Sequence, residues 1–250
     1  MKILCVIPSR INSFRLPRKA LVDLAGKPMI QRVYEAAIQC PEFSKVIVAT
    51  DSLEIESVIK GIQGNVEQTE AHHLTGSDRV AEVASRYPEM DIIVNLQGDE
   101  PFIRPEMLST LVKPLIQGES FPMTTLAYPL DFEKDHSTSS VVKVVFDKNF
   151  KSLYFSRSPL PFFQKKLSDL EMKELPVLHH MGVYAYKRDF LKIYTQLKQT
   201  PLELAESLEQ LRALENGYDI RVCPVKHKTL EINTPEELME AQKWALEFFR

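Results

Sequence analysis

Short apolar runs alternate along the first half of the chain with longer stretches whose apolar residues recur at helical spacing. The runs have the length of strands and lie at residues 2–8, 45–51, 65–69, 91–96 and 123–126, and the helical stretches lie at 29–39, 53–62, 77–86 and 105–117. This alternation is typical of a mostly parallel β-sheet with helices on both faces. We therefore predict an α/β fold with a mostly parallel central sheet and flanking helices.

The pattern changes near residue 141. Short strands predicted at 141–147, 153–156 and 182–186 indicate a small antiparallel subregion, embedded at about 141–187, that could form a subunit contact. Further on, the spacing predicts helices at 188–196, 202–215 and 235–249 and a strand at 220–225. The last helix begins with a capping box, in which Thr234 is the N-cap, Pro235 takes the first position and Glu237 lies three residues after the cap. Because no repeat or low-complexity linker interrupts the pattern, residues 1–250 are predicted to form one domain.

Cations cluster directly after the first predicted strand. The segment 8–19 contains Arg10, Arg15, Arg18 and Lys19. In an open parallel sheet the ligand crevice lies beyond the carboxyl ends of the strands, and guanidinium and ammonium groups there can bind phosphate oxygens. The segment has neither the GxxxxGK[ST] nor the GxGxxG pattern, so it is not a P-loop or a dinucleotide fingerprint. It predicts a polyphosphate site built from side chains, and an ordinary solvated basic loop is the alternative.

The composition narrows the kind of ligand. The chain has 250 residues and a formal net charge of -3, which argues against binding of nucleic acid and favours a small anionic ligand for a local basic loop. Met1 and Lys2 lead straight into a predicted strand without a long apolar segment, so we expect no membrane insertion and a cytoplasmic protein. Three cysteines, far apart in the sequence, indicate neither a disulfide framework nor a zinc site.

Two carboxylates follow the strand predicted at 91–96. Asp99 and Glu100 come just past its end, before Pro101, and would face the same crevice as the basic loop. A triphosphate held by cations normally also requires a divalent metal, and proteins bind Mg²⁺ through one or two carboxylates. Asp99 is therefore the predicted metal ligand, with a simple turn before the proline as the alternative.

Other polar residues give weaker signals. Ser77 and Arg79 lie at the start of a predicted helix, where an anion or a nucleobase edge could dock, although serine is also a common N-cap. His180 precedes a predicted strand, and a lone histidine is more often a structural residue than a ligand. Glu209 and Gln210 could lie at the edge of the cleft, which spacing alone does not decide.

Taken together, these segments resemble one known family. The matching segments, which run in order over nearly the whole chain, are Arg10-x-x-Ser13-x-Arg15-Leu16-Pro17-x-Lys19, Gly26-Lys27-Pro28-Met29-Ile30, Val48-Ala49-Thr50-Asp51, Gln97-Gly98-Asp99-Glu100-Pro101, Val142-Lys143-Val144-Val145-Phe146-Asp147, Tyr154-Phe155-Ser156-Arg157, His180-Met181-Gly182-Val183-Tyr184 and Leu208-Glu209-Gln210-Leu211-Arg212. In this order they resemble the 3-deoxy-manno-octulosonate cytidylyltransferases, or CMP-Kdo synthetases. Each segment alone could occur by chance, but the set is specific.

The resemblance implies a fold and a reaction. The fold would be the Rossmann-like nucleotide-diphospho-sugar transferase fold, and the chain would form a homodimer. The enzyme would join CTP to a 3-deoxy-octulosonate to give the CMP-sugar and pyrophosphate for lipopolysaccharide biosynthesis, with Mg²⁺, or Mn²⁺ in its place, as cofactor. The anomeric hydroxyl of the sugar would attack the α-phosphorus, so the site has to align the reactants and stabilise charge rather than supply a covalent nucleophile.

The resemblance also implies roles for individual residues. Lys19, Asp99 and Arg15 would be catalytic. The CTP phosphates would be bound by Arg10, Ser13, Arg15 and Lys19, and the cytidine would lie near Ser77 and Arg79. The sugar acid would contact Gln97, His180, Glu209 and Gln210, with Arg157 at its carboxylate. Asp99 and Asn233 would hold the metal.

Three positions depart from the pattern that the resemblance implies. Asn233 stands where the family has an aspartate, Arg18 where it usually has glycine, and Ala20 where it usually has proline. An amide oxygen can still bind a hard cation, but one negative charge is lost. Two alternatives therefore stay open beside the main hypothesis: a paralogue specific for a modified ulosonic acid, such as an amino-substituted Kdo, or a non-catalytic relative that binds CTP.

Overall fold

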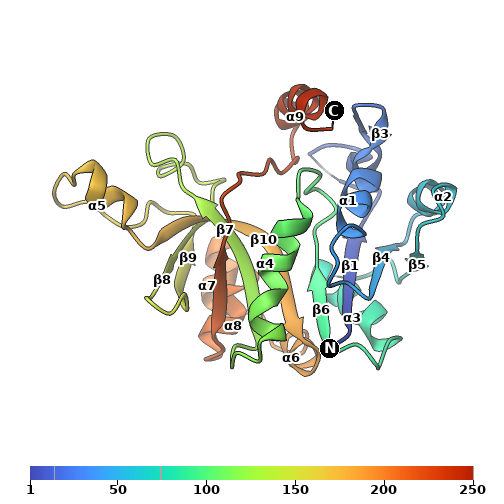
Figure 1. Ribbon diagram of the computed structural model, residues 1–250, viewed down its shortest axis with the longest axis horizontal. Helices are drawn as coiled ribbons and strands as arrows, with labels where there is room; N and C mark the ends of the chain where they lie inside the picture. Colours follow the sequence, from blue (N-terminus) through green and yellow to red (C-terminus); the bar gives the residue numbers. More distant parts are fainter. Residues whose placement is uncertain (14, 74, 250) are drawn as a thin grey trace.

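A twisted central sheet organises the molecule (Figure 1). The computed structural model describes residues 1–13, 15–73 and 75–249, and Phe14 of the predicted phosphate loop lies outside them. The strands of the sheet follow the order β11-β7-β10-β6-β1-β4-β5. Their bounds are Ile3–Ser9 for β1, Lys45–Thr50 for β4, Val66–Gln68 for β5, Ile92–Asn95 for β6, Met123–Pro129 for β7, Val177–Lys187 for β10 and Ile220–Pro224 for β11.

The direction of the strands confirms the predicted fold class. β1 runs parallel to β4 and to β6, β4 runs parallel to β5, and β11 runs parallel to β7. Because β6 and β7 are both antiparallel to β10, they point the same way as each other, and β10 alone is reversed in this series. The strands of this series are thus parallel except for β10.

The predicted antiparallel subregion extends from this same sheet. β8 (Lys143–Phe146) pairs with the first part of β10, and β9 (Ser152–Ser156) pairs with β8. The strand predicted at 182–186 is therefore only the last half of the longer β10, which begins at Val177. A short helix, α5 (Asp169–Lys173), lies beyond these strands and extends away from the sheet (Figure 1).

Helices cover both faces, as the apolar periodicity predicts. Along β1, Ile3, Cys5 and Ile7 belong to one buried cluster and Leu4 and Val6 to another, because successive side chains point to opposite faces. The first cluster includes residues of α1 (Met29–Ala37), α2 (Leu53–Gly61) and α4 (Pro105–Ile116). The second includes residues of α3 (Gly76–Ser85), α6 (Arg188–Tyr194) and α8 (Leu211–Glu215). A strand buried on both faces explains the unbroken apolar run in the sequence.

Two local features differ from the predictions. The single helix expected at 202–215 is two helices, α7 (Pro201–Glu206) and α8, because Ser207 ends the first in a left-handed conformation with φ of 53°. A hairpin of two-residue strands, β2 (Asp23–Leu24) and β3 (Lys27–Pro28), was not predicted. In the described ranges, no helix has the length and apolarity needed to cross a membrane.

The end of the described chain returns to its beginning. After β11 an extended segment leads to α9 (Pro235–Phe248), which lies beside the hairpin and α1 (Figure 1). The capping box predicted for this helix is confirmed. A third buried cluster joins α9 to the loop after β1: it contains Leu16, Leu24, Phe102, Ile232 and Ala241. This packing brings residues 231–233 next to the predicted phosphate loop.

Candidate active site

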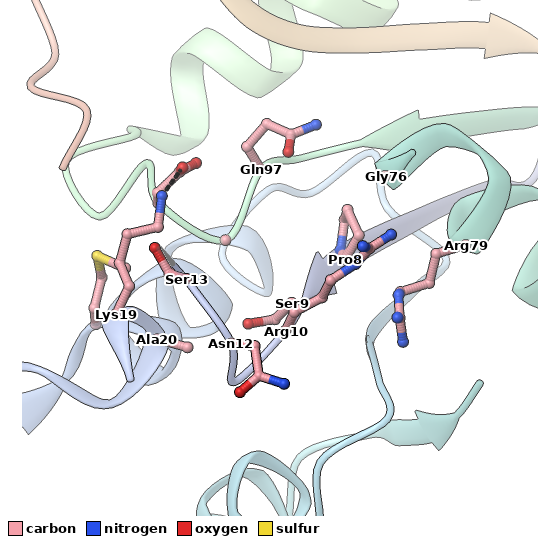
Figure 2. Close-up of a pocket in the computed structure, with 13 residues that line it drawn as sticks. Pro8, Ser9, Arg10, Asn12, Ser13, Lys19, Ala20, Gly76, Arg79 and Gln97 are labelled. Carbon is pink, nitrogen blue, oxygen red and sulfur yellow. Dashed lines mark hydrogen bonds and ion pairs between the residues drawn. The ribbon is translucent and has the colours of Figure 1, made fainter. Parts of the chain in front are cut away.

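A cavity of about 240 Å³ lies at the carboxyl ends of β1 and β6 (Figure 2). The loops that follow these strands approach each other closely at Gly98, where an added Cβ would lie 3.1 Å from the Pro8 carbonyl oxygen. The predicted site residues that line this cavity are Arg10, Ser13, Lys19, Arg79, Gln97 and Asp99. Ser13 and Lys19 lie at one end of the cavity and Arg10 and Arg79 at the other (Figure 2).

Lys19 links the phosphate loop to both predicted metal ligands. Its Nζ donates to Asp99 Oδ2 at 2.5 Å and to Asn233 Oδ1 at 3.0 Å. The side chains of Lys19 and Asp99 are 18% and 16% exposed, so the pair is shielded but still reachable from the cavity. Two hard oxygens, one of them anionic, therefore converge on the Lys19 ammonium although Asp99 and Asn233 are far apart in the sequence.

A second cavity, of about 300 Å³, borders Asn233. Arg15 lies here rather than in the first cavity, and its Nη2 donates to Asn233 Oδ1 at 3.0 Å. Arg157 and His180 also line it, together with Glu231. Asn233 thus lies between the two cavities, where it contacts Lys19 of the first and Arg15 of the second.

Arg79 has a buried side chain whose guanidinium is only partly used. Its Nη1 donates to the Thr69 hydroxyl and lies 3.4 Å from Asp51 Oδ1, while Nε and Nη2 have no partner among the described residues. Burial, opposed by Asp51, lowers the pKa of Arg79 below its ordinary value. A buried guanidinium with free donors at a cavity wall is suited to bind an acceptor of a ligand.

Arg157 is held in place by α7. Its main-chain N donates to Glu206 Oε2 at 2.9 Å, and its Nε donates to the Glu206 carbonyl at 2.8 Å. Nη1 donates to the Ser139 carbonyl at 3.2 Å. The guanidinium is therefore oriented at the wall of the second cavity, where it could bind a carboxylate.

His180 is buried on β10 and is kept neutral. Burial, with the neighbouring His179, lowers its pKa to about 3. Its Nε2 lies 3.0 Å from the Thr125 hydroxyl, which also lies 3.1 Å from the Met181 carbonyl. A carbonyl can only accept, so the hydroxyl donates to it and accepts a hydrogen bond from Nε2–H of the imidazole.

Other predicted residues lie outside these cavities. Among the described residues, Ser77, Glu209 and Gln210 are the predicted ligand contacts that line neither of them. Ser77 accepts a hydrogen bond from Asn95 Nδ2 at 3.4 Å beneath the first cavity. Burial raises the pKa of Glu209, and one oxygen of its carboxylate has no described partner. Ten of the thirteen predicted residues therefore line one of the two cavities, and these three line neither.

The donors present fit a magnesium ion. Asp99 and Asn233 direct a carboxylate oxygen and an amide oxygen to the same group, the Lys19 ammonium. Mg²⁺ is typically held by one or two carboxylates together with substrate phosphates. In the described ranges, no group of three or more His, Cys, Asp and Glu residues could form a site by itself. Any ion here would therefore depend on phosphate oxygens for the rest of its coordination.

Two further acidic residues lie at this site, and the sequence analysis missed one of them, Glu231. Glu100, which was expected to face the crevice, is 3% exposed, and burial, together with Glu231 and Asp99, raises its pKa well above the ordinary value. Glu231 keeps an open surface toward the second cavity, yet the surrounding protein atoms and Asp99 raise its pKa to about 7. The only sequence signal for Glu231 was its place two residues before Asn233.

Comparison with known proteins identifies the family. Residues 4–220 match the family model described as cytidylyltransferase. The 3-deoxy-manno-octulosonate cytidylyltransferases of Acaryochloris marina and Trichlorobacter lovleyi are 51% and 48% identical to the chain, and each alignment covers 97% of it and 96% or 98% of the relative. A solved structure of CMP:2-keto-3-deoxy-manno-octonic acid synthetase complexed with CTP superposes with a TM-score of 0.91 at 40% identity, covering 99% of both chains. With this fold and this arrangement of residues, the chain belongs to the 3-deoxy-manno-octulosonate cytidylyltransferase family.

Proposed function

We propose that the protein activates 3-deoxy-manno-octulosonate with CTP, giving the CMP-sugar and pyrophosphate for lipopolysaccharide biosynthesis. The observation that carries the proposal is the convergence of Lys19, Asp99 and Asn233 between two cavities. One cavity has the cations and buried donors that a nucleoside triphosphate needs, and the other has an arginine suited to a sugar carboxylate. The relatives named above and the CTP complex support the same reaction.

In this proposal the first cavity binds CTP. Arg10, Ser13 and Lys19 hold the phosphates, while the free donors of Arg79 bind acceptors of the cytidine. Each charge-assisted hydrogen bond to phosphate contributes about 1.5–3 kcal/mol. Lys19 can leave its carboxylate partner when a phosphate oxygen arrives, because both are anionic acceptors for the same ammonium.

The second cavity binds the sugar acid. Arg157 binds its carboxylate and neutral His180 binds a hydroxyl group, while Gln97 contacts the sugar from the first cavity, so that the anomeric oxygen lies in line with the α-phosphorus. Arg15 lies where it can stabilise the charge that develops on the phosphates as pyrophosphate leaves. Mg²⁺, or Mn²⁺ in its place, would be held by Asp99 and Asn233 and would neutralise phosphate charge.

The activity is tested by pyrophosphate release with CTP, Mg²⁺ or Mn²⁺, and a panel of ulosonic acids that includes Kdo and its amino-substituted analogue. Asp99→Asn should lower turnover at least about 100-fold, because it removes the anionic ligand while keeping the shape of the side chain. Asp189→Asn, at an exposed position on α6, is the matched control and should behave like the parent.

The alternatives give different results in the same assay. Turnover confined to the amino-substituted acid would favour a paralogue, and CTP binding without turnover on any acid would favour a non-catalytic relative. An Asp99→Asn variant with parental turnover would overturn the metal assignment. The names of the relatives favour the main hypothesis over both alternatives.

The protein is also proposed to be a cytoplasmic homodimer organised as one domain. Apolar side chains around the antiparallel subregion support the dimer: Phe162 is 86% exposed, Leu170 is 75% exposed and Leu153 is 58% exposed. Large apolar side chains exposed in one region of a protein are typical of a surface that another chain covers. A second copy of the chain is the proposed partner.

A further inference from the structure

The side-chain amide of Asn233 is bonded at both ends. Its Oδ1 accepts from Arg15 Nη2 and from Lys19 Nζ, each at 3.0 Å. Its Nδ2 donates to Glu231 Oε1 at 2.7 Å. The main-chain N of Asn233 donates to Glu237 Oε2 at 2.7 Å, so the residue is fixed through its backbone as well.

Only one orientation of this amide satisfies its neighbours. If the amide were rotated by half a turn, its NH₂ group would face the donors of Arg15 and Lys19, and its oxygen would face the carboxylate of Glu231. Neither contact is a hydrogen bond, because donors would meet donors and an acceptor would meet an acceptor. The identities of the neighbours therefore decide which end of the amide faces the first cavity.

The neighbours of the Asn233 amide differ in whether they can keep their contacts with it when CTP binds. In the proposed CTP complex, Arg15 and Lys19 turn their donors to phosphate oxygens and no longer both hold the amide oxygen. Glu231 has no such competing task, since its carboxylate is directed to the Asn233 amide at the wall of the second cavity. It is the contact that can hold the amide while its oxygen is given to a cation.

We propose that Glu231 is a positioning residue, which keeps the Asn233 amide oxygen turned toward the phosphate loop and the proposed metal. This inference rests on the proposed function for its consequence in catalysis, but the orientation itself is a property of the free protein. Second contacts of this kind commonly orient a ligand residue and tune its affinity for a cation.

The proposal requires the side chains at 231 and 233 to be complementary, one with a donor where the other has an acceptor. An aspartate at 233 would place its outer oxygen against the Glu231 carboxylate, so that two acceptors would share the space of one hydrogen bond. A glutamine at 231 could instead donate its NH₂ group to that oxygen. We therefore expect Asn233→Asp to bind Mn²⁺ more tightly when it is combined with Glu231→Gln than when it is made alone.

The orientation is tested first in the free protein by NMR of the Asn233 side-chain NH₂ group, whose signal is assigned by its loss in Asn233→Ala. Glu231→Ala should shift this signal and speed its hydrogen exchange. Glu231→Gln, which keeps an acceptor oxygen, should leave it near the parental position, as should Glu240→Ala at an exposed position of α9. An unchanged signal in Glu231→Ala would overturn the proposal.

The consequence for the cation is tested by a double-mutant cycle, with Mn²⁺ binding in the presence of CTP followed by EPR. Glu231→Ala should weaken binding about five-fold, as expected for the loss of one hydrogen bond. In an Asn233→Ala background the same change should cost less than about two-fold, because the group it positions is gone. Equal losses in both backgrounds would overturn the proposal. If the parent binds no Mn²⁺ with CTP, the proposed function fails, and the NMR signal still decides the orientation.

Discussion

Arg18 adopts a left-handed backbone conformation, with φ of 56° and ψ of 29°. Its guanidinium pairs with Glu54 at the surface of α2, and it lines neither cavity described above. Its charge is thus directed away from the phosphate site. Glycine, which the family resemblance implies at this position, takes up such a conformation without the steric cost that a side chain brings.

Two substitutions at this position separate backbone strain from charge. Arg18→Gly and Arg18→Ala both remove the exposed ion pair, but only alanine keeps a Cβ that opposes positive φ. The glycine variant should have the higher free energy of unfolding, by about 1 kcal/mol. Urea unfolding of the two variants measures the difference. Equal stability would show that the loop relaxes to negative φ when the arginine is removed.

The sequence predicted those site residues that follow strands. Arg10, Lys19 and Asp99 lie in the segments that follow β1 and β6, where the rules of parallel sheets place ligands, and the structure brings them together. Glu231 could not be found in this way, because it lies in an extended segment far along the chain from the cations. A carboxylate in such a segment resembles any solvated acid until tertiary packing places Asn233 beside it.

At the scale of elements, β10 connects the parallel sheet to the antiparallel subregion and carries His180 into the second cavity. The histidine contributes a pH dependence of known sign. The unfolded chain takes up a proton on it near pH 6.5, whereas the folded protein holds it neutral down to about 3. Between these values the unfolded state binds more protons, so this contribution to stability is complete above pH 6.5 and falls as the pH falls.

A variant without the titrating group reveals this contribution. Relative to His180→Gln, the parent should lose about 1.4 kcal/mol of unfolding free energy for each pH unit between 6 and 4.5. Denaturant unfolding at several pH values measures the difference between the two proteins. A constant difference for His180→Gln would mean that His180 is protonated in the folded protein.

Elements with a strong periodic signal were predicted well, and short ones were not. β1 and β6 read as strands because every residue in them is buried. The two-residue strands β2 and β3 are too short to show any period, and the hairpin is held instead by packing under α9. The break between α7 and α8 depends on one left-handed residue, Ser207, which helical spacing cannot detect.

At the scale of the whole molecule, Phe102 joins the loop after β6 to the C-terminal segment. It is fully buried, with Trp244, Phe248 and Phe249 of the C-terminal segment packed around its ring at centroid distances of 5.3–5.6 Å. Phe102→Ala should lower the free energy of unfolding by about 3–5 kcal/mol. Leu246→Ala on the exposed side of α9 should change it little. Urea unfolding of both variants checks this, and similar small effects would mean that α9 is not essential to the core.

The proposed homodimer is tested on the same scale. Phe162→Glu places a charge on the exposed apolar surface of the antiparallel subregion, and burying it in an interface without a partner would be costly. Sedimentation velocity should therefore show a dimer for the parent and a monomer for the variant. Met239→Glu, on the exposed face of α9, is the matched control and should sediment like the parent. A monomeric parent would rule the dimer out.

The hydrogen bond between Lys19 and Asn233 affects when the site can form during protein synthesis. The two residues lie 214 positions apart in the chain. Proteins begin to fold from the N-terminus while they are still being made. A nascent chain that has not yet emerged as far as residue 233 can form β1, β6 and the first cavity, but not the link between the two cavities. The link between Lys19 and Asn233 therefore forms only after residue 233 has left the ribosome, long after the residues of β1 and β6 have been made.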